Sequence, residues 1–165
     1  MKKLWVVLAV VLVLTLVFSI VGVAKQEKPD VLCKATGGVQ LYYPEYEWAD
    51  KVNFTFNVHA LGGYQGKGEA SWVKHNPMYV DAPVQIHRVE VTYAECLGDG
   101  QMVFGGNVET TPGPPPSPTL YFYVIDGGTP GGAGDEVNTS WGSPANWDYG
   151  GVPLSVEGGN LVVRD

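Results

Sequence analysis

A glycine-rich stretch flanked by acidic residues is the part of this sequence best suited to holding a metal ion. Residues 127–134 read GGTPGGAG and lie between Asp126 and the pair Asp135 and Glu136. Carboxylates and backbone carbonyls are the ligands that calcium prefers, and glycine permits the tight backbone path of a cage. A long hairpin turn, in which the aspartates accept hydrogen bonds from backbone amides, is the alternative. The sequence therefore predicts either a calcium site or a capped turn.

Aromatic residues gather in two further segments that are typical of loops. Aromatic rings combine an apolar face with a polar edge, so they can stack on sugar rings while they stay in contact with water. Loops also carry binding residues more often than cores do. The alternative is that these rings plug the open end of a barrel. The hypothesis of a glycan-binding platform rests on Tyr43, Tyr46, Trp48, Trp147 and Tyr149.

The sequence gives little support to catalysis. It contains neither Gly-x-Ser-x-Gly nor His-Glu-x-x-His, which would indicate a serine hydrolase or a zinc protease. Glu90 and Glu109 exemplify a carboxylate pair, but nothing distinguishes an acid from a base. His59, His75 and His87 are separated by sixteen and twelve residues, which is not a zinc-binding spacing. We therefore expect surface histidines, and we assign no catalytic residue.

The elements that would position these residues are short β-strands. Glycine and proline, 22 and 12 of the 165 residues, punctuate runs in which apolar and polar residues alternate. This pattern is typical of half-buried strands. The clearest run places Val52 and Phe54 on one face and Asn53 and Thr55 on the other. Candidate strands cover residues 37–43, 51–60, 67–74, 84–96, 101–109, 119–126, 136–142 and 159–164.

Short, turn-rich connections between these runs predict an all-β antiparallel meander. About eight strands in this order can close into a small barrel, with a two-sheet β-sandwich as the alternative. A change of phase in the fourth run predicts a β-bulge near His87 and Arg88. The run at 119–126 is apolar on both faces, so we expect it to be central or covered on its outer side. Trp72 and Trp141 lie inside strands and are expected in the core.

The chain has two cysteines, Cys33 and Cys96. An even number in an oxidising compartment favours one disulfide, and two free thiols are the alternative. Because the bridge would close a long loop, the chain-entropy model predicts a stabilisation of about 4 kcal/mol.

The N-terminal region has the layout of a secretory signal peptide. Lys2 and Lys3 precede an apolar run that ends with small residues at Ala24, where we expect cleavage. An uncleaved membrane anchor is the alternative, because the run is long enough to cross a bilayer. We expect a secreted, extracellular protein. Its predicted parts are a signal peptide at 1–24, a polar leader at 25–35 and a single β domain at 36–165.

Removal of the predicted signal peptide leaves a strongly acidic domain. The segment holds two of the ten basic residues and none of the 17 acidic ones, so the formal net charge changes from −7 to −9. This balance argues against nucleic acids and anionic membrane surfaces as partners, because both attract basic patches. Extracellular glycans, cations and surface proteins are the partners that such a surface allows.

Several segments, taken in their order along the chain, carry a family resemblance. They include Phe54–Val58, Phe104–Gly106 and the most specific segment, Tyr121–Gly131, which reads YFYVIDGGTPG. With Gly158–Val163 at the end, the chain resembles the post-COAP family of small secreted bacterial domains over about residues 37–164. The resemblance implies an extracellular all-β domain, found alone or appended to other secreted modules. It brings no established activity, cofactor or catalytic residue.

These observations favour a non-catalytic secreted β module that binds a glycan or a cell-surface partner. An extracellular polysaccharide hydrolase and a calcium-stiffened structural surface protein are the alternatives. Calcium is the one cofactor that the sequence suggests.

Overall fold

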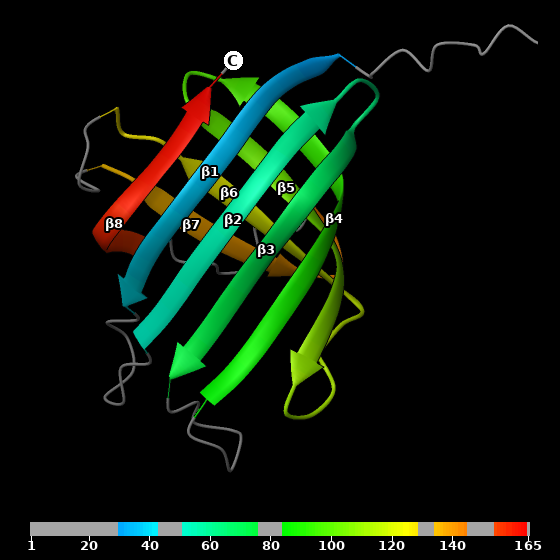
Figure 1. Ribbon diagram of the computed structural model, residues 1–165, viewed down its shortest axis with the longest axis vertical. Helices are drawn as coiled ribbons and strands as arrows, with labels where there is room; N and C mark the ends of the chain where they lie inside the picture. Colours follow the sequence, from blue (N-terminus) through cyan, green and yellow to red (C-terminus); the bar gives the residue numbers. More distant parts are fainter. Residues whose placement is uncertain (1–29, 43–50, 76–83, 129–133, 145–153, 165) are drawn as a thin grey trace, which may run out of the picture.

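Segments with alternating apolar and polar residues form the strands of an antiparallel barrel (Figure 1). The computed structural model describes residues 30–42, 51–75, 84–128, 134–144 and 154–164. The strands are β1 (Val31–Tyr42), β2 (Lys51–Leu61), β3 (Gln65–His75), β4 (Val84–Gly98), β5 (Gln101–Thr111), β6 (Thr119–Ile125), β7 (Glu136–Trp141) and β8 (Leu154–Arg164). Each predicted strand corresponds to one of them, so the predicted all-β meander is confirmed.

Each strand pairs in antiparallel fashion with the next along the chain, and β8 returns to pair with β1. Figure 1 shows β1 to β4 side by side across the front of the barrel, with β6 and β7 behind them. The seam between β7 and β8 consists of two residue pairs, Glu136 with Ser155 and Val137 with Leu154. The pairing between β7 and β8 is therefore the shortest among the described strands, and we call it the narrow seam.

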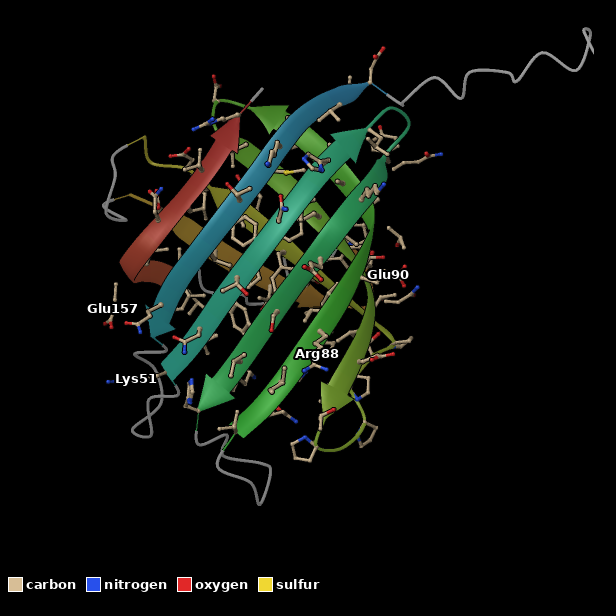
Figure 2. The ribbon with its side chains drawn as sticks, viewed as in Figure 1. Lys51, Arg88, Glu90 and Glu157 are labelled. Atoms are coloured by element: carbon tan, nitrogen blue, oxygen red, sulfur yellow. A yellow bond between two sulfur atoms is a disulfide. The ribbon has the colours of Figure 1, made fainter. Side chains whose placement is uncertain are left out.

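Aromatic rings fill the inside of the barrel. The ring centroids of Phe54 and Phe122 lie 4.5 Å apart, and those of Phe104 and Phe122 lie 5.5 Å apart. Trp72 is buried against these rings, and Trp141 is partly buried against the same core, as predicted. Figure 2 shows side chains filling the space between the front and back strands. The inner face of the sheet is thus devoted to packing.

The predicted bulge at His87 and Arg88 is wrong. The pairing of β4 with β3 and with β5 runs without a break through these two residues. His87 occupies an inward position that the alternation of apolar residues had not revealed, and Ile86 lies on the outer face. The register of β4 with β5 shifts elsewhere, between Val91 and Tyr93 and again between Cys96 and Gly98. A buried histidine, and not an extra residue, therefore explains the change of phase in the sequence.

Strand β1 begins earlier than its sequence suggests. It starts at Val31, inside the segment that was expected to be a polar leader. Its first inward residues, Cys33 and Ala35, are buried. Because neither is a large apolar residue, the alternating pattern that marks the other strands is weak here. Register with β2 holds this part of the chain in the barrel wall.

Cys33 in β1 and Cys96 in β4 form the predicted disulfide, with their Cα atoms 6.2 Å apart. A structural disulfide indicates folding in an oxidising compartment of the extracellular type. In the part of the chain that the structure describes, we find no apolar helix of membrane-spanning length.

Candidate functional site

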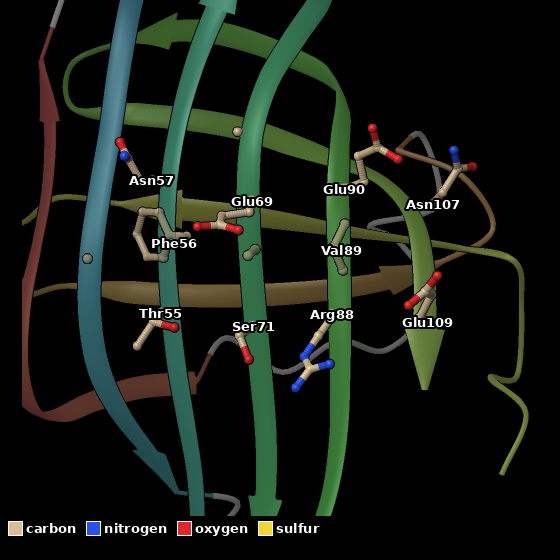
Figure 3. A pocket seen from close by; sticks show the side chains of 13 residues that line it. Thr55, Phe56, Asn57, Glu69, Ser71, Arg88, Val89, Glu90, Asn107 and Glu109 are labelled. Carbon is tan, nitrogen blue, oxygen red and sulfur yellow. The ribbon is translucent and has the colours of Figure 1, made fainter. Parts of the chain in front are cut away.

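A polar groove lies on the outer face of strands β2 to β5 and has a volume of about 690 Å3 (Figure 3). Part of its lining is the barrel wall itself, including Gly68, Ala70 and Val89. The rest consists of polar side chains that project from the outer face of the sheet. These side chains, which we call the outer groove, are Thr55, Asn57, Glu69, Ser71, Arg88, Glu90, Asn107 and Glu109.

Strand register arranges the outer groove as two parallel rows that cross four strands. The first row consists of Asn57, Glu69, Glu90 and Asn107. The second row consists of Thr55, Ser71, Arg88 and Glu109. Because every second residue of a strand faces outward, the rows lie roughly 7 Å apart. The groove therefore presents a regular grid of amide, hydroxyl, carboxylate and guanidinium groups.

The charges of the outer groove are not neutralised pairwise. Glu69 lies directly opposite Glu90 on the neighbouring strand, an arrangement of like charges that disfavours folding. In Figure 3 the carboxylate of Glu69 leans toward β2, away from Glu90. The guanidinium of Arg88 points toward β3, and it forms no ion pair with a described carboxylate, although Glu109 is its partner in the β4–β5 register. Packing of the fold alone does not account for this arrangement.

Hydrogen bonding also distinguishes the outer groove from the rest of the barrel. Among the described residues, none of the eight side chains donates or accepts a hydrogen bond. Elsewhere on the outer face, half-buried polar side chains do find partners: Asn53 contacts the Nε2 atom of His75 at 3.0 Å, and Tyr93 donates to Glu95 at 2.7 Å. The groove therefore offers donors and acceptors that a ligand with many hydroxyl groups can bind.

Close backbone approach shapes the wall of the groove at Gly68. The residue has a φ of 143°, and a Cβ atom added there would lie 2.0 Å from the carbonyl oxygen of Asn57. A side chain at this position would collide with the backbone of β2, so only glycine fits. The position of Asn57 in the groove thus depends on the absence of a side chain on its neighbouring strand.

A second outer feature lies beside the groove and consists of tyrosines. We call Tyr64, Tyr93, Tyr121 and Tyr123 the tyrosine patch. The rings of Tyr64 and Tyr93 are parallel within 3°, with centroids 6.0 Å apart, and Tyr121 meets Tyr93 edge-on at 5.9 Å. On the outer face of residues 119–126, Tyr121 thus meets a ring from β4, while Tyr121 and Tyr123 both stay half-buried. The sequence does not single out the patch, because Tyr64 lies in a turn and Tyr93 follows the bulge in β4.

Hydrogen bonds hold two rings of the tyrosine patch. The hydroxyl of Tyr93 donates to Glu95, and that of Tyr123 donates to Oε1 of Gln101 at 2.5 Å. Burial and the hydrogen bond to Glu95 raise the pKa of Tyr93 to about 12. Burial, followed by the charge of Glu136, also raises the pKa of Tyr123. Both phenols are neutral at physiological pH, so this part of the patch carries no charge.

The five residues of the predicted aromatic platform lie outside the described residues. Tyr43, Tyr46 and Trp48 fall in the segment 43–50, and Trp147 and Tyr149 fall in the segment 145–153. Their role in glycan binding stays a prediction.

The acidic residues around the glycine-rich turn cap backbone amides. Asp126 accepts hydrogen bonds from the amides of Gly128 and Val163, at 2.8 and 3.0 Å. The carboxylate of Asp135, which is 1% exposed, accepts from the amides of Gly127 and Leu161, at 2.9 and 3.2 Å. Each aspartate therefore ties β8 to the β6–β7 connection beside the narrow seam.

This capped turn is the alternative that the sequence offered to a calcium site. Among the described residues, no three acidic, histidine or cysteine side chains are placed to hold a metal ion, and Glu136 follows Asp135 as the first residue of β7. Residues 129–133 of the turn lie outside the described ranges. Calcium binding by Asp126, Asp135 and Glu136 stays a prediction.

The expectation of surface histidines holds for His59 but is wrong for His87. His59 lies on the outer face of β2, whereas His87 is 2% exposed inside the barrel. One ring nitrogen of His87 contacts the hydroxyl of Thr110 at 2.7 Å, and Nε2 is buried without a hydrogen-bond partner. Burial, with a smaller effect of the charge on Lys74, lowers the pKa of His87 to about 4. The histidine is therefore neutral and serves the core.

Comparisons with models of protein families, with curated protein sequences and with solved structures found no match to this chain.

Proposed function

We propose that the protein is a secreted, non-catalytic module that binds a neutral glycan on the outer face of strands β2 to β5. The observation that carries the proposal is the outer groove, in which eight polar side chains face solvent without hydrogen bonds among the described residues. Sugars present many hydroxyl groups that both donate and accept, and amide, carboxylate and guanidinium groups match them.

The interior of the barrel favours this outer location. Small-molecule sites in barrels of this size often occupy the interior. Here the rings of Phe54, Phe104 and Phe122 lie in mutual contact inside the barrel. A ligand therefore has more polar partners outside the wall than within it.

The charge of the outer groove favours an uncharged glycan over an acidic one. The outer groove holds three glutamates, Glu69, Glu90 and Glu109, and one cation, Arg88. This excess of carboxylates repels polyanions such as acidic polysaccharides, and the net charge of the chain, −7, adds to the repulsion. An uncharged polysaccharide meets no such penalty.

The disulfide supports export of the protein, because bridges of this kind persist in oxidising compartments. Expression in a host that exports the chain, followed by N-terminal sequencing, tests the predicted cleavage. We expect the mature protein to begin at Lys25. An intact Met1 on the exported protein would favour the uncleaved anchor instead. We also propose membership of the post-COAP family, which the all-β fold supports.

Binding is tested by affinity electrophoresis and calorimetry with neutral polysaccharides: xylan, glucomannan, hydroxyethylcellulose and soluble chitin oligomers. Figure 2 shows a matched pair of cations, with Arg88 in the groove and Lys51 at the start of β2, away from it. We expect Arg88→Ala to raise the Kd at least about tenfold, because a hydrogen bond to a charged group is lost. Lys51→Ala should bind as the wild type does. Failure of all four polysaccharides to bind, or equal binding by both variants, would refute the proposal.

A hydrolase remains the second candidate because the structure brings Glu90 and Glu109 into one groove. Paired carboxylates are the catalytic groups of most glycoside hydrolases. Incubation with the same polysaccharides and an assay for reducing ends separates the candidates. Release of reducing ends that Glu90→Gln or Glu109→Gln abolishes would establish catalysis. Binding without release supports the non-catalytic module.

A further inference from the structure

We propose that the tyrosine patch and the outer groove form one continuous site for an extended, uncharged polysaccharide chain, with Tyr64 as the stacking position at its far end. The inference rests on the proposed function and adds to it the class of ligand, a polymer that is longer than the groove alone.

Strand register makes the two features continuous. Asn107 of the outer groove lies two residues from Gly105 on the outer face of β5. Gly105 pairs with Tyr93 on one side and with Tyr121 on the other. Two residues along a strand correspond to roughly 7 Å, so the tyrosines begin where the groove ends.

Glycine lets the first ring of the patch lie directly against the barrel wall beside the groove. Gly105 is buried, and a Cβ atom there would lie 2.5 Å from Cδ1 of Tyr121. The ring of Tyr121 therefore lies over β5, next to the position that follows Asn107 on the outer face. A chain that leaves the groove at Asn107 meets this ring next.

Tyr64 has the exposure and the geometry of a stacking residue. Its side chain is 62% exposed, which makes it the most exposed large hydrophobic residue among those described. Its ring lies parallel to that of Tyr93, with the centroids 6.0 Å apart, in the stacked geometry that aromatic pairs prefer. The hydrogen bond to Glu95 holds the ring of Tyr93 in place, so Tyr64 packs against a ring whose position is fixed.

The tight turn between β2 and β3 holds Tyr64 in a left-handed backbone conformation. Tyr64 has a φ of 62°, a left-handed conformation that side-chain-bearing residues rarely adopt. Its carbonyl oxygen accepts the amide of Ala94 at 3.2 Å, so the turn is locked onto β4. Glycine would adopt this conformation without strain, as Gly63 does beside it at a φ of 73°. The turn therefore fixes the position of the Tyr64 ring beside Tyr93.

A second copy of the chain is the competing occupant of an exposed aromatic surface. Charge disfavours it, because two copies that each carry −7 would approach through faces rich in glutamate. An uncharged polysaccharide meets no such repulsion at the tyrosine patch.

The test compares cello- and xylo-oligosaccharides of increasing length, from disaccharide to hexasaccharide, by calorimetry on the full mature domain. Wild-type affinity should rise with length until the chain spans both groove and patch. Tyr64→Gly removes the ring and relieves the strained φ, so the fold should keep its melting temperature. We expect this variant to bind the hexasaccharide roughly tenfold more weakly and the disaccharide unchanged. Tyr64→Phe keeps the ring and should bind as the wild type does.

Three other outcomes would contradict the continuous site. Wild type that binds no oligosaccharide and none of the four polysaccharides refutes the proposed function and this inference together. Binding that depends on Arg88 but is unchanged in Tyr64→Gly leaves the groove as the site and refutes the continuous site. Concentration-dependent dimerisation of the wild type that Tyr64→Gly abolishes, measured by sedimentation, assigns the patch to a second copy.

Discussion

The inner and outer faces of strands β2 to β5 share one backbone but follow opposite rules. On the inner face, Phe54 and Phe104 are fully buried and contact other aromatic rings. On the outer face, Glu69 lies opposite Glu90, and Arg88 lacks an ion pair with any described carboxylate. Period two along each strand makes this separation possible, since a residue and its neighbour face opposite sides. The inner face accounts for the stability of the barrel, and the outer face keeps arrangements that stability does not favour.

Replacement of an aromatic ring on the inner face should have the largest effect on the free energy of unfolding. Phe54→Ala should lower the free energy of unfolding by about 4 kcal/mol, because a large cavity opens where four rings meet. Thr55→Ala, one residue along on the outer face, should change it by less than about 0.5 kcal/mol. Urea denaturation of both variants measures the difference. Similar losses in the two variants would contradict the contrast.

His87 sharpens the contrast because it is a titratable group on the inner face. Its pKa of about 4 in the folded protein lies below the ordinary value of 6.5. Between these values the unfolded chain binds more protons than the folded one, so stability falls as the pH drops from 6.5 to 4. The loss should reach about 3 kcal/mol and stop below pH 4.

The measurement is the free energy of unfolding of wild type and His87→Gln at several pH values. Other groups titrate alike in both proteins, so the difference between the two curves isolates His87. A difference that stays constant from pH 7 to pH 4.5 would show that His87 is protonated without cost in the folded state.

Asp135 is an exception to the contrast, since it is a polar side chain that is almost completely buried. Both of its oxygens accept backbone amides, from Gly127 and Leu161. Asp135→Asn turns one acceptor into a donor that faces an N–H group, so we expect a loss of about 2 kcal/mol. In Asp135→Asn, amide exchange should accelerate more at Leu161 than in strands β2 to β4. This result would locate the loss of stability beside the β7–β8 seam. The partly exposed Asp126→Asn should cost less.

The sequence was sufficient for the strands and their order, because alternation is a local signal and short turns leave few other pairings. It was misleading where an inner position holds a polar residue, as at His87, or a small one, as at Ala35. The disulfide followed from the number of cysteines and the expected compartment. The strand predictions succeeded because alternation involves residues that are neighbours along the chain.

The outer groove could not be predicted in the same way. Asn57, Glu69, Glu90 and Asn107 come from four strands and meet only through register, which the sequence does not state. A bulge in β4 that the sequence did not indicate also decides that Tyr93 faces outward beside Tyr121. One signal was available: the apolar outer face of residues 119–126 indicated that something must cover it.

The smallest effect, and the most informative about function, concerns Glu69. Its replacement by glutamine removes the repulsion from Glu90 directly opposite and should raise the free energy of unfolding by a few tenths of a kcal/mol, more at low salt than at high salt. Glu157→Gln, on β8, removes the same charge from an exposed position outside the groove and serves as the control. If the groove binds a polysaccharide, Glu69→Gln should also weaken binding while it stabilises the fold, since a neutral amide is a weaker acceptor. Stability that rises in Glu69→Gln without any loss of binding would show that this glutamate serves neither the fold nor the ligand, and the contrast between the two faces would then lose its functional meaning at this position.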